Sequence, residues 1–428
     1  MKKVFPAILI LLVICMLLAG CSGAESPGES ATATFTPEPT ATPEVTPTPV
    51  PVTEPTARPV ARELTEGLKL SDNHGVYLPH LLDCDADTWV SYYWGSELYI
   101  ESSEPMASLY LCWFRSPGRY TVRVSGGSFF AGETEYLYEY IQLPFPTNRV
   151  ELAFEGAANL CDVRAFTKGE TPEYVQRWQP PLEQADVLVF PTHADDETVF
   201  FGGLIADCVD RGISVQVAYM VSHLYTGYNG NTRPQELLNA LWELGVHNYP
   251  VFGPFQDQFL SKWDDAEEFY GMSNVIGWQV EQLRRFKPLV AVGHDRYGEY
   301  GHAAHMMNGQ SLESSVKLSG DKRHFGRSAD TWGVWTPQKL YLHFAPENQI
   351  TLDLEHPLEH FGGRTAFEVA CDAMQFHKSQ LKYKHRPTLD DEDFPRYDCR
   401  LFGLVRSSVG EDTGSDIMEN TYRDEPET

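Results

Sequence analysis

Hydrophobic and polar positions follow two different patterns along the chain. Between residues 62 and 175, short runs alternate apolar and polar side chains at 97–101, 108–114, 120–124 and 150–154, and Gly, Pro and Asn separate them. A two-residue period with such punctuation is typical of strands. We therefore predict a small all-β sandwich here. Its aromatic residues Trp89, Tyr92, Tyr93 and Trp94 could stack on sugars, although aromatic residues in strands more often belong to a core.

From residue 181 to 410, compact apolar runs alternate with stretches of helical periodicity. The expected strands lie at 185–190, 214–221, 289–293 and 339–344, and the expected helices at 197–211, 233–244, 267–286, 302–316 and 364–382. This alternation predicts an α/β domain with a Rossmann-like, mostly parallel sheet and flanking helices. No G-x-G-x-x-G follows the first strand, so the pattern does not support dinucleotide binding.

Both ends of the chain differ from these two regions. Lys2 and Lys3 precede an apolar run at 6–18, and Leu-Ala-Gly-Cys ending at Cys21 resembles a bacterial lipobox. We predict a lipoprotein signal peptide over 1–21, lipidation of Cys21, and attachment to the extracytoplasmic face of a bacterial membrane. A plain cleaved signal peptide or an uncleaved anchor are the alternatives. Residues 22–61 are rich in Thr and Pro and predict a disordered linker, and residues 411–428 predict an acidic flexible tail.

The formal net charge of −27 makes nucleic acids poor candidates for a binding partner. A strongly acidic surface repels the phosphates of DNA and RNA. We therefore expect no nucleic-acid partner, whereas the charge does not separate an enzyme from a binding module.

Candidate chemistry gathers after two of the predicted strands. His193-Ala194-Asp195-Asp196-Glu197 directly follows the first apolar strand of the second region. In open α/β sheets, ligands bind beyond the carboxyl ends of the strands. Three adjacent carboxylates repel one another unless a cation offsets them, and an imidazole with a carboxylate suits zinc.

A third zinc ligand is expected from a distant strand end. The stretch from His294 to His305 follows the strand at 289–293, and His302 and His305 stand three residues apart. At helical spacing they share one face, so one can bind metal while the other faces the substrate. Asp295 is a candidate to orient a histidine ligand, or it merely caps a turn.

These sequences resemble the PIG-L/LmbE zinc deacetylases. His193 to Glu197 is similar to the family's HPDDE signature, with Ala194 in place of Pro, and Gly301 to His305 is similar to its GHxxH element. Arg233 and Glu236 match its R-x-x-E helix. The resemblance spans about residues 181–381 and implies a PIG-L/LmbE-like fold.

The resemblance also implies roles for single residues. His193, Asp196 and His305 would bind Zn²⁺, and Asp195 would be the general base. His302 would stabilise the oxyanion or protonate the leaving amine. Arg233 could contact substrate, or could equally be an ordinary helix charge.

Together these observations predict an extracytoplasmic, zinc-dependent N-deacetylase. Its expected substrate is a glycan or glycoconjugate that contains N-acetylglucosamine, and its expected membrane contact is the lipid anchor. Two alternatives stay open: a non-catalytic carbohydrate-binding lipoprotein, and a zinc amidase for a larger acyl group.

Overall fold

The computed structural model describes residues 59–222, 232–390, 392 and 395–423. The predicted signal peptide, Cys21, nearly all of the predicted linker and the last five residues of the predicted tail lie outside these ranges. Within them, no helix is both long and apolar enough to cross a membrane.

The N-terminal part of the described chain is built from antiparallel strands. They are β1 (Lys69–Asp72), β2 (Val90–Tyr92), β3 (Glu97–Arg115), β4 (Tyr120–Val124), β5 (Gly127–Ala131), β6 (Tyr138–Phe154) and β7 (Ala158–Phe166). The first two expected strands are one long strand, β3, whose pairing with β6 shifts register between Glu101 and Ser108. One half of β3 pairs with β1 and the other with β7. Trp113 of the second half packs on Tyr120 of β4, so the two halves share a core.

The second part contains the predicted α/β sheet. Its strands run in the order β10-β9-β8-β11-β12-β14-β13, and the first five are parallel. Their bounds are β8 (Val187–Phe190), β9 (Val215–Ser222), β10 (Val251–Gln256), β11 (Val290–Gly293), β12 (Lys339–His343), β13 (Gln349–Thr351) and β14 (Leu401–Ser407). The predicted mostly parallel, Rossmann-like architecture is confirmed.

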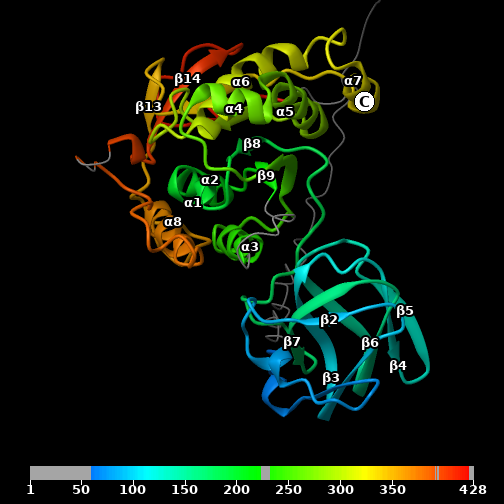
Figure 1. Ribbon diagram of the computed structural model, residues 1–428. Helices are drawn as coiled ribbons and strands as arrows, with labels where there is room; N and C mark the ends of the chain where they lie inside the picture. Colours follow the sequence, from blue (N-terminus) through cyan, green and yellow to red (C-terminus); the bar gives the residue numbers. More distant parts are fainter. Residues whose placement is uncertain (1–58, 223–231, 391, 393–394, 424–428) are drawn as a thin grey trace, which may run out of the picture. The chain divides into compact units, whose positions relative to one another are not determined.

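Helices cover both faces of this sheet (Figure 1). They are α1 (Asp196–Val199), α2 (Gly202–Asp210), α3 (Arg233–Glu243), α4 (Trp263–Tyr270), α5 (Met272–Phe286), α6 (Ala303–Ser319), α7 (Gly326–Trp332) and α8 (Ala366–Met374). Val187 and Val189 of β8 join the apolar cluster that includes α2, α3 and α8. Leu188 and Phe190 join the cluster that includes α4, α5 and α6. Successive strand residues point to opposite faces, so an unbroken apolar run fills two cores.

Three expected helices are shorter than the periodicity suggests. The helix at 197–211 is divided into α1 and α2 at Phe200 and Phe201, which are both buried. The helix at 267–286 is divided at Gly271, whose φ of 72° suits glycine and ends α4. The helix at 364–382 stops at Met374, and the following residues form turns whose His377 and Ser379 bond Glu197 and Glu236.

The acidic C-terminal segment is packed against the α/β domain as far as the described residues reach. Asp412 pairs with the buried Lys339, Asp416 with Arg211, and Arg423 with Asp186. Residues 411–423 therefore differ from the predicted flexible tail, because their charges meet partners on the domain.

A close approach between α6 and the loop after β11 gives a stability prediction. A Cβ atom on Gly309 would lie 2.7 Å from the carbonyl oxygen of His294 and 2.9 Å from that of Asp295. We expect Gly309→Ala to lower the free energy of unfolding by about 1–3 kcal/mol, because backbone must move. Gly326→Ala, where the Cβ meets nothing within 4 Å, is the matched control and should be neutral or slightly stabilising. Equal urea midpoints for both variants would contradict this packing.

Candidate metal and catalytic site

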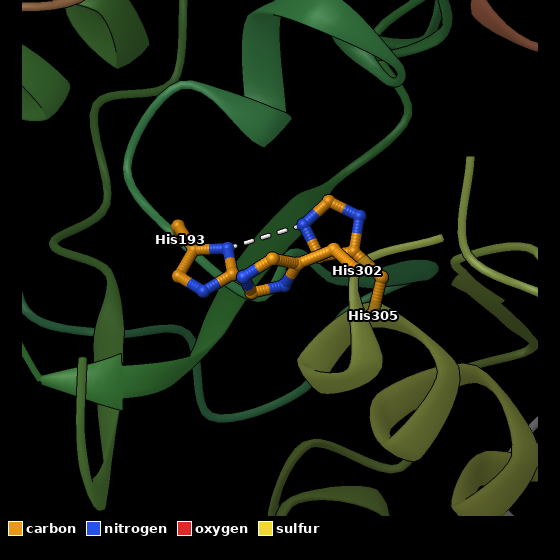
Figure 2. Close-up of side chains that lie close together, drawn as sticks. All are labelled: His193, His302 and His305. Atoms are coloured by element: carbon orange, nitrogen blue, oxygen red, sulfur yellow. Dashed lines mark hydrogen bonds between the residues drawn. The ribbon is translucent and has the colours of Figure 1, made fainter. Parts of the chain in front are cut away.

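The predicted site residues meet at the carboxyl edge of two neighbouring strands. Strands β8 and β11 are paired in parallel. His193 and Asp196 follow β8, while His302 caps the N-terminus of α6 and His305 lies in its first turn. Figure 2 shows the imidazoles of His193, His302 and His305 facing one another.

The three expected metal ligands surround one point. Nδ1 of His193 lies 3.1 Å from Nε2 of His305. Oδ2 of Asp196 lies 3.4 Å from the first nitrogen, and Oδ1 of Asp196 lies 3.3 Å from the second. A tetrahedral ion that binds nitrogen and oxygen at about 2.0–2.1 Å separates its ligand atoms by roughly 3.3 Å. The donor set and its spacing therefore fit zinc.

Two further observations agree with a cation at this point. His305 also belongs to two overlapping groups whose ligand atoms lie within 4.8 Å of one another, one with His193 and His302, the other with Asp196 and His294. Although burial opposes protonation of His305, the carboxylates of Asp196 and Glu299 raise its pKa to about 10. The surroundings thus favour positive charge here, which a metal ion supplies.

Asp196 is held by the chain itself. Its Oδ2 accepts hydrogen bonds from the backbone N–H groups of Thr192 and His193 at 3.0 and 2.6 Å. Burial disfavours its charge, but attraction to His305 and His294 holds its pKa well below the usual value. The carboxylate is therefore ionised and fixed in direction before any metal binds.

Glu299 orients the histidines from behind. Its carboxylate lies 2.7 Å from Nδ1 of His305, 2.8 Å from Nδ1 of His294 and 3.2 Å from Nδ1 of His343. Such a carboxylate fixes the tautomer of a ligand, leaving Nε2 of His305 free to bind. Asp295, the sequence candidate for this role, instead pairs with Arg396 and accepts from the N–H of Tyr297.

Asp195 has a strained backbone. Its φ is 107°, in a region that side chains other than glycine rarely adopt, at a cost of about 1–3 kcal/mol. Its N–H donates to Glu197 at 2.9 Å, and its carbonyl accepts from the Thr198 hydroxyl at 2.7 Å. Burial, opposed by Arg233 and reinforced by Asp196, raises the pKa of Asp195 to about 7. A carboxyl group with that pKa suits a general base.

The two charged residues of the R-x-x-E helix, Arg233 and Glu236, bind two different segments of the chain. Arg233 donates to the carbonyl of Ala194 and to the Asp195 carboxylate at 3.1 Å. Glu236 accepts from the N–H and hydroxyl of Ser379 at 2.7 and 2.6 Å. Arg233 therefore holds the loop that follows β8 and contains Asp195. Its contact with substrate stays a prediction.

His302 lies beside the expected ligands without joining their tight triangle. Its ring centroid is 4.8 Å from that of His193 and 5.0 Å from that of His305. Its Nδ1 is buried and has no hydrogen-bond partner among the residues that the structure describes. Burial and the neighbouring histidines lower its pKa to about 2, so it is a neutral group that can donate one hydrogen bond.

Four supporting residues were not among the predicted site residues. They are Asp257, whose Oδ1 lies 3.7 Å from Nε2 of His193, together with Glu299, His343 and His377. His343 ends a buried strand beside β11, so the strand-end rule could have indicated it. His377, which bonds Glu197, follows a helix remote in sequence and carried no such signal.

Comparison with known proteins agrees with this geometry. The GlcNAc-PI de-N-acetylase (PIG-L) family matches residues 188–314, the segment that holds both clusters. Residues 188–314 are a PIG-L domain. The similarity to a deacetylase family thus lies in this domain of the chain.

The PIG-L domain also has curated relatives. A 1D-myo-inositol 2-acetamido-2-deoxy-alpha-D-glucopyranoside deacetylase 2 of Saccharopolyspora erythraea is 26% identical over 270 residues, which cover 54% of this chain and 97% of that protein. A related deacetylase of Rhodococcus opacus is 28% identical over 184 residues, 37% of this chain and 61% of that protein. The structure of N,N'-diacetylchitobiose deacetylase from Pyrococcus horikoshii is 20% identical with a TM-score of 0.37, covering 47% and 73% of the two chains.

The position of Glu299 in the PIG-L domain gives a prediction about metal affinity. Glu299→Gln should weaken zinc binding about 10- to 100-fold, because a neutral amide orients His305 less strongly. The measurement is competition for zinc with a chromogenic chelator. Glu281→Gln, on the exposed side of α5, is the matched control and should bind zinc like the wild type. Equal affinities in both variants would rule out this role.

Proposed function

We propose that this chain is a zinc-dependent hydrolase that removes the N-acetyl group from an N-acetylglucosamine-containing glycan or conjugate. The observation that carries the proposal is the triangle of His193, Asp196 and His305, with Asp195 and His302 beside it. When bound, zinc supplies Lewis-acid chemistry: it acidifies a water molecule and polarises a carbonyl oxygen.

The chain's own residues supply the proton transfers. The oxygen of a water molecule bonds to the acetyl carbon. Asp195 accepts a proton from this water as the bond forms. His302 donates a hydrogen bond to the oxygen that gains negative charge. The C–N bond then breaks, and the proton held by Asp195 passes to the departing nitrogen. Water and the amide thus become a free amine and acetic acid, which releases its proton to give acetate.

Arg233 and Glu197 keep Asp195 ready for this work. The guanidinium of Arg233 binds its carboxylate, and Glu197 accepts from its backbone N–H. A base held by both side chain and backbone loses little entropy during the reaction.

The names of the relatives support the choice of sugar. The family is described by its action on GlcNAc-PI, and two curated relatives act on an inositol glycoside of 2-acetamido-2-deoxyglucose. In each case the acetamido group sits on glucosamine. We propose that the target here is also an N-acetyl group on glucosamine, and that the glycan or conjugate that carries it lies outside the cytoplasm.

Removal of metal separates this function from non-catalytic sugar binding. The zinc-loaded chain should release acetate from N-acetylglucosamine compounds, and a chelator should abolish the release until zinc is restored. Larger N-acyl groups tested in parallel would reveal an amidase if they react faster. Sugar binding without any acetate release would refute the proposal.

Two variants separate metal binding from proton transfer. His305→Ala should lose both zinc and activity, because it removes a ligand. Asp195→Asn should keep its zinc while kcat falls about 10²- to 10⁴-fold, because the base is lost. Zinc content by atomic absorption and acetate release together check this, and Asp195→Asn with wild-type kcat would exclude Asp195 as the base.

The proposed location rests on the lipobox-like sequence before Cys21. In a bacterial host, the wild-type chain should incorporate labelled fatty acid and sediment with membranes. Cys21→Ser should do neither, because the thiol that carries the lipid is absent. Cys208→Ser, which changes a buried cysteine of α2, is the control and should keep the label. A labelled Cys21→Ser chain would contradict the anchor.

A further inference from the structure

A row of five rings passes through the candidate metal site. We call it the aromatic row, and its members in spatial order are Phe259, His302, Tyr300, His385 and Tyr383. Successive ring centroids are 5.1, 5.7, 4.9 and 6.1 Å apart. The rings come from three remote stretches: the segment after β10, the segment before α6, and the segment after α8.

Three rings of the row are exposed, whereas His302, which lies between Phe259 and Tyr300, is buried. Phe259 is 73% exposed, Tyr383 52% and Tyr300 42%, whereas His302 is 4% exposed. Ligand-binding sites are commonly lined by aromatic side chains together with a few polar groups. Exposed aromatic rings therefore lie on both sides of His302 along the row.

The chemistry of the row suits sugars better than lipid chains. Two imidazoles and two phenols interrupt the apolar surface, so it is no continuous hydrocarbon wall. Beside Phe259, the Asp257 carboxylate lies near His193 and Arg233 and can accept from hydroxyl groups. Apolar ring faces flanked by polar acceptors match a pyranose, which has an apolar face and hydroxyls around its edge.

We infer that the aromatic row is an extended strip for a glycan chain of at least three sugar rings. The N-acetylated sugar that reacts lies at His302. One neighbour stacks on Phe259, and sugars on the other side stack along Tyr300, His385 and Tyr383. The inference rests on the proposed deacetylation and narrows its substrate from any conjugate to an internal unit of an oligosaccharide.

Chain-length dependence of deacetylation tests the strip. The full zinc-loaded chain is assayed with N-acetylglucosamine and with its β-1,4-linked oligomers of two to six units, and kcat and KM are measured for acetate release. For the wild type, kcat/KM should rise with length through a falling KM. In Phe259→Ala and Tyr383→Ala, the ratio of kcat/KM for hexamer over monomer should fall about three- to tenfold each.

Matched variants distinguish stacking from structural damage. Phe259→Tyr keeps a ring and should retain the wild-type ratio. Phe269→Ala removes an exposed ring on α4 outside the row and should leave the ratio unchanged. A loss of activity that is equal for monomer and hexamer would indicate damage alone and would overturn the strip.

The outcomes separate this inference from the proposed function. If the wild type releases acetate but shows no dependence on length, the strip is wrong and the deacetylase stands. If an alkyl glycoside of the monomer loses as much in Phe259→Ala as the hexamer does, the row binds an apolar aglycone and the strip is wrong. If no compound yields acetate, both proposals fall.

Discussion

A single buried carboxylate, that of Asp196, is the constraint on which the site depends. Two backbone N–H groups bind one of its oxygens, and three imidazoles surround it. Such a charge is tolerable in a protein interior only where donors and positive charge meet it. The carboxylate is therefore stable only when the loop after β8, the end of β11 and the start of α6 are folded together. Under the proposed metal binding, metal affinity and fold stability are coupled at this residue.

The supporting contacts extend this constraint in two directions. Glu299 fixes three histidines from one side, while Arg233 and Glu197 fix the strained Asp195 from the other. Strain at Asp195 persists because several partners determine its conformation at once. The same partners explain how Ala194 can replace proline: the loop is held by side chains instead of by a fixed φ angle.

Much of the site could be predicted because its residues follow apolar strands directly. The alternation of strands and helices gave a parallel sheet, and parallel strands bring their carboxyl ends to one edge. Glu299 could not be separated from Asp295 in this way, since both lie in the same loop, and only the structure shows that Glu299 is the carboxylate that contacts His305. Likewise, the helical pattern of the sequence continues beyond Met374, where α8 ends. The hydrogen bonds of His377 to Glu197 and of Ser379 to Glu236 accompany this end, and the sequence pattern did not indicate them.

The pairing of Lys339 with Asp412 has a consequence for where the catalytic domain ends. Lys339 lies in β12, next to β11, and its ammonium group has no solvent contact. A fragment cut at residue 410, the boundary that composition suggests, would leave that ammonium buried without its counter-ion, a defect of about 3–5 kcal/mol. The part of the chain that packs around the sheet therefore includes the acidic segment through at least Ile417, whose carbonyl also accepts from Lys339. The acidic composition of this segment suggests that it can be removed, yet it supplies the partners of a buried lysine of the sheet.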